Sequence, residues 1–168
     1  MPGGGPDLLI HNFAGLYGEP ERSLGNEARS TWSLSLDQAR RLLDEAFRRS
    51  ERVTVVDKPT VRRHAAALFR EAAGDRPIEL VNADAFVVKL LKDPHQYELI
   101  ACTSFLGDVL SDLLAALGTG LPSAASVSFS PTVSVFEPVH GTAPHRIGRA
   151  DPSGAIAAAA MLLEHLKG

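Results

Sequence analysis

Two aspartates spaced one helical turn apart form the pattern in this chain with the clearest chemical use. Asp108 and Asp112 follow a strand-like run at residues 97–102 and open a long apolar segment that predicts a helix. If Ser104 caps that helix, the two carboxylates are stacked on one helix face. Carboxylates at this spacing can share a hard divalent cation such as Mg²⁺ or Mn²⁺. A solvated acidic helix face has the same spacing, so the pattern alone leaves both interpretations open.

Three further polar side chains come at strand ends or helix starts, where α/β proteins place functional residues. Tyr17 lies in a glycine-rich turn after a short apolar strand, Lys58 follows an apolar run, and Asp84 falls in the first turn of a predicted helix. A tyrosine and a lysine can exchange protons with a substrate hydroxyl and an enolate carbon. A metal held by three aspartates can stabilise the enolate. Taken singly, a packed turn tyrosine and a surface lysine are the commoner explanations, so the prediction depends on their joint occurrence.

Strands and helices alternate along the chain and must position these residues. We expect strands at residues 7–10, 53–56, 78–81, 97–102 and 132–136. We expect a helix from residue 36, after a capping box at residues 35–38, that ends among Arg48, Arg49 and Arg52. Further helices are expected over 61–73 capped by Thr60, over 83–92 capped by Asn82, after Ser104 as far as the stop signal at 118–120, and from 153 to near 167. The polar stretch at residues 21–34 is compatible with a loop, a short hairpin or an arm that meets a partner subunit. This order predicts an α/β fold, with an at least partly parallel sheet flanked by helices.

Composition narrows the class of protein further. The chain has 168 residues with 45% hydrophobic and 22% charged side chains, which suits one globular domain or two small lobes. A formal net charge of −3 gives no basic footprint for nucleic acid or an anionic membrane. No apolar run is long enough to cross a bilayer. The single cysteine, Cys102, excludes an internal disulfide framework and fits a reducing compartment, so we expect a cytoplasmic protein.

These motifs together resemble a known family, the β-decarboxylating dehydrogenases that act on isocitrate, isopropylmalate or homoisocitrate. The resemblance covers most of the chain from about residue 7 onward, and the motifs occur in the family's order. They are a catalytic-tyrosine turn at residues 15–20, a catalytic-lysine strand end at 56–58, an aspartate motif at 82–85, a two-aspartate metal motif at 105–112 and a coenzyme loop at 136–144.

The resemblance implies an isopropylmalate-dehydrogenase-like fold in truncated form. It divides the chain into a disordered leader at residues 1–6, a small dimerisation and catalytic domain at 7–118, and a remnant of the large coenzyme-binding domain at 119–168. It also implies a homodimer with two shared active sites. In each site Tyr17, Asp108 and Asp112 of one subunit would meet the partner subunit's Lys58 and the partner subunit's Asp84, with Mg²⁺ or Mn²⁺ between the aspartates.

The resemblance further implies a coenzyme site for NAD(P). Two of its residues, His145 and Arg146, stand where the family distinguishes NAD from NADP. Such a pair can bind a phosphate, although it is equally well explained as two solvated cations in a loop. The residues expected to contact the coenzyme are Glu137, His140, Gly141, Ala143, His145, Arg146 and Asp151.

Several departures from the family pattern weigh on the function. The family's N-terminal segment, which supplies substrate-binding arginines and part of the nicotinamide pocket, is expected to be missing. Ile10 stands where the family usually has another carboxylate-binding arginine, and Thr60 and Ser104 replace asparagines that lie close to the nicotinamide. An apolar Ile10 suggests a substrate that is less anionic than isocitrate.

Three functions follow. The first is metal-dependent proton transfer or decarboxylation of an oxo or hydroxy acid without net oxidation, because hydride transfer needs both reactants held within near-attack distance. The second is NAD(P)-dependent oxidative decarboxylation of a 2-hydroxy acid, with any missing segment supplied by a partner chain. The third is a catalytically silent regulatory subunit. The full set of polar residues argues against it, because a silent subunit has no chemical need for them.

Overall fold

The structure, a computed structural model, describes residues 5–118, 120–130, 132–141, 148–149 and 151–167. It forms two compact units, one ending at Ser111 and the other beginning at Asp112, so the division falls within helix α4 (Ser104–Leu117). The sequence-based division at residue 118 falls at the end of the same helix and stays a prediction.

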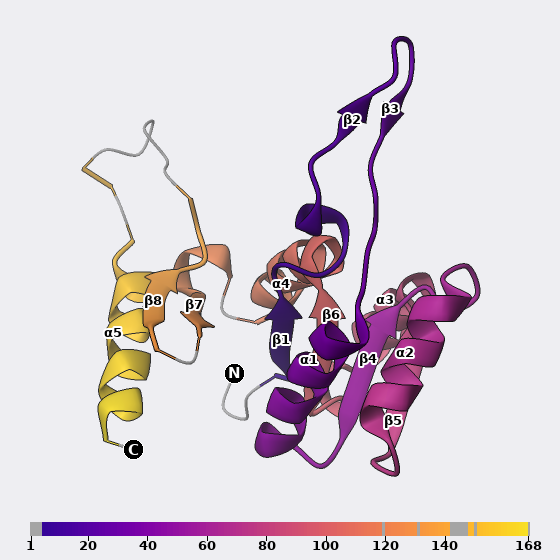
Figure 1. Cartoon of the computed structure of the whole chain (residues 1–168). Helices are drawn as coiled ribbons and strands as arrows, with labels where there is room; N and C mark the ends of the chain where they lie inside the picture. Colours follow the sequence, from indigo (N-terminus) through magenta and orange to yellow (C-terminus); the bar gives the residue numbers. More distant parts are fainter. Residues whose placement is uncertain (1–4, 119, 131, 142–147, 150, 168) are drawn as a thin grey trace. The chain divides into compact units, whose positions relative to one another are not determined.

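A four-stranded parallel sheet forms the centre of the first unit (Figure 1). The strands lie in the order β1-β6-β4-β5, and every neighbouring pair is parallel. All residues of the two central strands are buried, as expected for a parallel sheet covered on both faces. This confirms the predicted α/β class. The strands are β1 (Asp7–His11), β4 (Val53–Asp57), β5 (Ile78–Asn82) and β6 (Leu99–Thr103).

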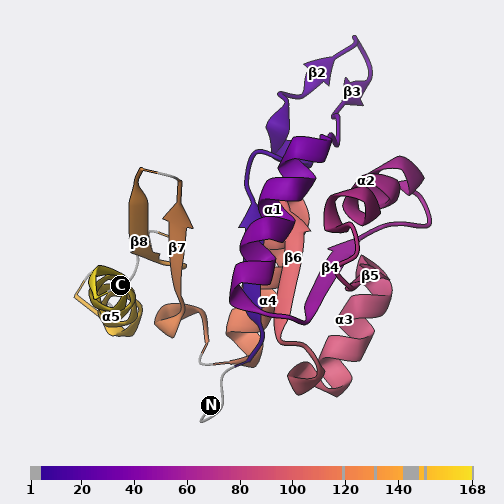
Figure 2. The ribbon, with the colours of Figure 1, turned by 60° about the horizontal axis from the view of Figure 1, so that its bottom comes forward.

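Helices cover both faces of this sheet (Figure 2). Leu9 belongs to the core formed with α1 and α2, whereas the next residue, Ile10, meets α4 at Gly107. Because successive strand residues point to opposite faces, α1 and α4 lie on opposite sides of the sheet. Besides α4, this unit contains the helices α1 (Leu36–Arg49), α2 (Arg63–Ala73) and α3 (Ala83–Lys92) and the 3-10 helices η1 (Leu16–Gly18) and η2 (Pro94–Gln96).

The capping box predicted at the start of α1 is present. The Ser35 hydroxyl accepts from the Gln38 amide at 3.2 Å, and the Gln38 side chain accepts from the Ser35 amide at 2.8 Å. These two bonds satisfy backbone donors that otherwise have no partner at a helix start. Helix α3 spans residues 83–92, as the sequence predicts.

Three predicted helix caps are wrong, for a common physical reason. The Thr60 hydroxyl donates to the Asn82 side-chain oxygen at 2.9 Å, so neither residue caps a helix, and α2 begins at Arg63. Ser104 is buried as the first residue of α4, and its hydroxyl accepts from the Tyr17 amide at 3.2 Å. In each case a side chain that can cap its own helix bonds instead to a segment distant in sequence.

The polar stretch between Tyr17 and α1 contains a short antiparallel hairpin that extends away from the sheet (Figure 1). Its strands are β2 (Arg22–Ser23) and β3 (Ala28–Arg29), and both are exposed. Gly25 in the turn has a φ of 81°, a conformation that favours glycine. The hairpin alternative is thus observed, and contact of this hairpin with a partner subunit stays a prediction.

The second unit consists of an antiparallel hairpin packed on one helix. Strand β7 (Ala125–Phe129) pairs with β8 (Ser134–Pro138), and α5 (Ser153–Leu166) packs against both, beside the 3-10 helix η3 (Leu121–Ser123). Strand β7 was not among the strands predicted from the sequence, and β8 begins later than predicted. Among the described residues, no helix combines the length and apolar character needed to cross a membrane.

Replacing Gly107 with alanine is expected to destabilise the first unit. An added Cβ would lie 2.5 Å from Ile10 Cγ2, and the β-branched Ile10 side chain has little freedom to move away. We expect a loss of about 1 to 3 kcal/mol in the free energy of unfolding, measured by urea denaturation. Combining Gly107→Ala with Ile10→Ala should cost less than the sum of the two single changes. Strict additivity would contradict this packing.

Candidate active site

All four candidate residues of the first unit follow strands of the parallel sheet. Tyr17 comes after β1, Lys58 after β4, Asp84 after β5 and Asp108 after β6. Because the strands are parallel, these loops and helix starts all emerge at the carboxyl edge of the sheet, where open α/β sheets bind ligands. The strand order makes β1 and β6 neighbours, and likewise β6 and β4, and β4 and β5, and the side-chain bonds then show which residues pair.

Tyr17 and Asp108 form the pair beside β1 and β6. The phenol donates to Asp108 Oδ2 at 2.6 Å, and the Tyr17 amide donates to the Ser104 hydroxyl at the start of α4. Gly15, with a φ of 93°, turns the chain toward this position. The hydrogen bond to the Asp108 carboxylate raises the pKa of Tyr17, because it stabilises the neutral phenol. Tyr17 is half exposed, which leaves it accessible to a substrate.

Lys58 and Asp84 form the pair beside β4 and β5. The ammonium nitrogen lies 2.5 Å from Asp84 Oδ1, and both side chains reach solvent. This hydrogen bond lowers the pKa of the Asp84 carboxyl, so the carboxylate stays ionised over the physiological range. An ionised carboxylate is the form that binds a cation.

Asp112 lies one turn after Asp108 on α4, and both side chains are exposed. Their oxygens are the hard donors that Mg²⁺ and Mn²⁺ prefer, so the pair fits half of a metal site. Across the described ranges, no group of three His, Cys, Asp or Glu side chains is close enough to hold a metal ion. Asp84 is engaged with Lys58, so one chain offers the carboxylates as separate groups.

The sequence analysis missed three residues around Lys58. Asp57, the last residue of β4, is only 1% exposed and accepts from the Lys58 amide at 2.8 Å. Its carboxylate pairs with Arg62 at 2.5 Å, and the Arg62 guanidinium lies 4.5 Å from the centre of the Trp32 ring. An acidic residue directly after a buried strand run was the available signal, because such a charge needs a partner when it is buried.

The predicted coenzyme residues lie in the second unit. Glu137 is part of β8, and His140 Nδ1 lies 3.3 Å from the Gly141 carbonyl oxygen. Asp151 Oδ1 accepts from the Ser153 hydroxyl at 2.6 Å and from its amide at 2.9 Å, so it stabilises the start of α5. These bonds lower the pKa of Asp151. The remaining predicted contacts lie outside the described residues, namely Ala143, His145 and Arg146.

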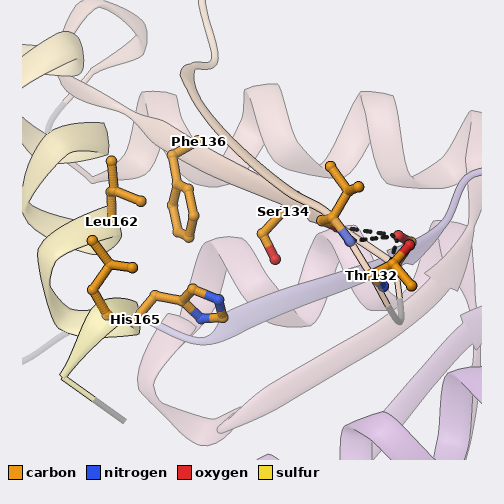
Figure 3. A pocket seen from close by; sticks show the side chains of 8 residues that line it. Thr132, Ser134, Phe136, Leu162 and His165 are labelled. Atoms are coloured by element: carbon orange, nitrogen blue, oxygen red, sulfur yellow. Dashed lines mark hydrogen bonds between the residues drawn. The ribbon is translucent and has the colours of Figure 1, made fainter.

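The second unit also contains an open pocket of about 370 Å³ (Figure 3). Phe136 of β8 faces His165 of α5, with ring centres 5.4 Å apart, and Leu162 lines the same wall. None of the predicted site residues lines this pocket.

Comparison with known proteins identifies the family. The family model for isocitrate/isopropylmalate dehydrogenase matches residues 5–168. The chain belongs to this family. The resemblance stated from the motifs is thereby confirmed. Family members are dehydrogenases, so the family chemistry is that of oxidoreductases, and the lyase or isomerase chemistry placed first by the sequence analysis gains no support.

Relatives in the isocitrate/isopropylmalate dehydrogenase family match nearly the whole chain. A 3-isopropylmalate dehydrogenase of Salinibacter ruber is 36% identical, over 97% of this chain and 49% of the relative. An isocitrate/homoisocitrate dehydrogenase of Thermus thermophilus is 37% identical, over 99% of this chain and 55% of the relative. The crystal structure of isocitrate dehydrogenase from Methylococcus capsulatus superposes with a TM-score of 0.84 at 30% identity, covering 95% of this chain and 52% of that one. The chain thus spans about half the length of these relatives.

The Tyr17–Asp108 bond predicts a measurable titration. In a Tyr97→Phe background only one tyrosine titrates, and Asp108→Asn should lower its pKa toward the ordinary value of about 10, because the negative acceptor is removed. The phenolate absorbance of metal-free protein would be followed against pH. Asp112→Asn, one turn away and without a bond to Tyr17, is the matched control and should change the titration less. An unchanged pKa in Asp108→Asn would rule out the bond.

Proposed function

We propose that this chain takes part in the metal-dependent, NAD(P)-linked oxidative decarboxylation of a 2-hydroxy acid. The single observation that carries the proposal is the arrangement at the carboxyl edge of the sheet. There a tyrosine–aspartate pair and a lysine–aspartate pair lie at neighbouring strand ends. Family membership favours this dehydrogenase reaction over the non-oxidative one.

In this proposal Tyr17 and Lys58 move protons. The Tyr17 phenol is held neutral by Asp108, so it is able to donate a proton to an enolate carbon after carbon dioxide leaves. Lys58, oriented by Asp84, is placed to exchange a proton with the substrate hydroxyl. When bound, Mg²⁺ or Mn²⁺ on Asp108 and Asp112 polarises the hydroxyl or carbonyl oxygen and stabilises the enolate. NAD(P) would supply the hydride acceptor for this reaction.

The proposed assembly is a homodimer with two shared sites. Within one chain the Tyr17–Asp108 and Lys58–Asp84 pairs are separate, and Asp84 does not join the other aspartates. A second copy would bring its own lysine–aspartate pair to the tyrosine–aspartate pair and supply the third carboxylate. The chain spans about half the length of its relatives, and a partner chain would supply substrate and coenzyme contacts that it does not carry.

The non-oxidative reaction remains as a second candidate on one specific observation. Ile10, at the carboxyl end of β1, packs its side chain against Gly107 of α4, so this position offers no cation to a substrate carboxylate. A weaker hold on the substrate would impair hydride transfer more than proton transfer, because hydride transfer needs two reactants in register. A silent regulatory role is disfavoured, because two solvent-accessible acid–base pairs have no structural necessity at an exposed edge.

Metal binding tests the donor set independently of turnover. Asp108→Asn and Asp112→Asn should each weaken Mn²⁺ binding by at least about tenfold, because each removes a charged oxygen ligand. Titration calorimetry or Mn²⁺ paramagnetic resonance would measure the dissociation constant. Asp75→Asn, at an exposed turn away from the sheet edge, is the matched control and should bind as the wild type does. Equal affinity in all three variants would remove the proposed ligands.

Turnover tests the reaction itself. The protein with Mn²⁺ would be given 2-hydroxy and β-keto acids with and without NAD(P)⁺, while carbon dioxide and reduced nicotinamide are measured together. Equal amounts of both products, only with coenzyme, are expected. Lys58→Ala should lower the rate by about 10² to 10⁴, the usual contribution of a proton-transfer group. Lys89→Ala removes another exposed, carboxylate-paired lysine and should leave the rate unchanged. Carbon dioxide without coenzyme would favour the second candidate.

A further inference from the structure

The turn that carries Lys58 is fixed by bonds on both sides of that residue. The Lys58 carbonyl accepts from the amides of Val61 and Arg62 at 2.9 and 2.7 Å. On the other side, the Lys58 amide donates to Asp57 Oδ1 at 2.8 Å. The lysine backbone therefore depends on the position of the Asp57 carboxylate and of Arg62.

Arg62 holds the Asp57 carboxylate in place. Asp57 is 1% exposed, and the Arg62 side chain is 13% exposed, with 2.5 Å between Nη1 and Oδ1. A buried carboxylate needs such a partner, since its desolvation is otherwise uncompensated. Arg62 thus supports the Lys58 turn twice, through its own amide and through the carboxylate that its side chain pins.

Trp32 connects the Lys58 turn to the turn that carries Tyr17. Its ring lies beneath the Arg62 guanidinium at 4.5 Å, and its indole nitrogen donates to the Thr103 hydroxyl at 3.2 Å. Thr103 is the last residue of β6, and the hydroxyl of the next residue, Ser104, accepts a hydrogen bond from the Tyr17 amide. A continuous path of contacts therefore runs from the Lys58 turn, through Arg62 and Trp32, to the Tyr17 turn.

A glycine and an aromatic ring fit closely around this path. A Cβ on Gly15 would lie 2.7 Å from Thr103 Oγ1 and 2.9 Å from the Trp32 indole nitrogen. The Phe105 ring meets Trp32 edge to face, with centres 6.2 Å apart. Trp32 is therefore confined on several sides, as a residue that transmits position must be.

We propose that Arg62 and Trp32 are positioning residues that fix the Lys58 turn and the Tyr17 turn in position relative to each other. They touch neither pair of proton-carrying atoms and act through Asp57 on one side and through Thr103 and Ser104 on the other. The catalytic part of this inference rests on the proposed function. The mechanical part, that the two turns are coupled through Arg62 and Trp32, stands on the contacts alone.

Amide hydrogen exchange tests the mechanical part. Removing Arg62 alone leaves a buried charge and endangers folding, so the variant is the charge-balanced Asp57→Asn/Arg62→Met. The Tyr17 amide should exchange at least about tenfold faster in it, because the path to Ser104 is loosened, whereas the amides of α3 should be unchanged. Arg63→Met, the same substitution at the exposed neighbour, is the control and should exchange as the wild type does. A folded double variant with unchanged Tyr17 exchange would overturn the proposal.

Trp32→Phe separates the two halves of the path. A phenyl ring keeps a face for the Arg62 guanidinium but lacks the indole N–H that donates to Thr103. Exchange at Tyr17 should therefore rise, while the Val61 and Arg62 amides in the Lys58 turn keep their protection. Equal loss at both turns would point to general loosening and overturn the proposed role of Trp32.

Kinetics then tests the catalytic part. In both variants kcat should fall by about tenfold or more while KM and Mn²⁺ affinity stay near those of the wild type, because misplacement affects the reacting geometry rather than ligand binding. Accelerated Tyr17 exchange with unchanged kcat would overturn the catalytic part. A wild type without turnover would count against the proposed function, and the exchange experiment would still decide whether the two turns are coupled.

Discussion

The parallel pairing of the four central strands is the constraint on which the rest of the first unit depends. Parallel strands need a crossover after each one, and here every crossover leaves from the same edge. The full burial of β4 and β6 requires helices on both faces, so the polar side chains that follow the strands have only the edge left to occupy. The gathering of tyrosine, lysine and aspartates at that edge is thus a consequence of the topology.

Much of the local structure was predictable from the sequence, because its signals lie within a few residues. The Ser35–Gln38 capping box depends on local capping chemistry, and the bounds of α3 and the start of α5 follow from the local sequence pattern. The residues that follow each strand were also identifiable. Their pairing was not, because the order β1-β6-β4-β5 is set by contacts between segments distant in sequence. That order places Tyr17 with Asp108 and Lys58 with Asp84.

The errors share that origin. Thr60, Asn82 and Ser104 have the right chemistry to cap helices, and each instead bonds to a residue from another loop. Trp32 lies in a polar stretch without periodicity, and its importance comes from Arg62 above its ring and Thr103 at its indole nitrogen. Local propensity cannot predict a side chain whose partners lie 30 or more residues away, since tertiary contacts override it.

The isoleucine at position 10 contributes to the packing beneath the carboxyl edge of the sheet. Its side chain fills the space left by Gly107, where α4 approaches β1, and so contributes to placing Asp108. An arginine at this position would have to leave that contact to reach a substrate. With isoleucine here, position 10 contributes packing and no charge, and the side-chain bonds of the Tyr17–Asp108 and Lys58–Asp84 pairs do not involve it.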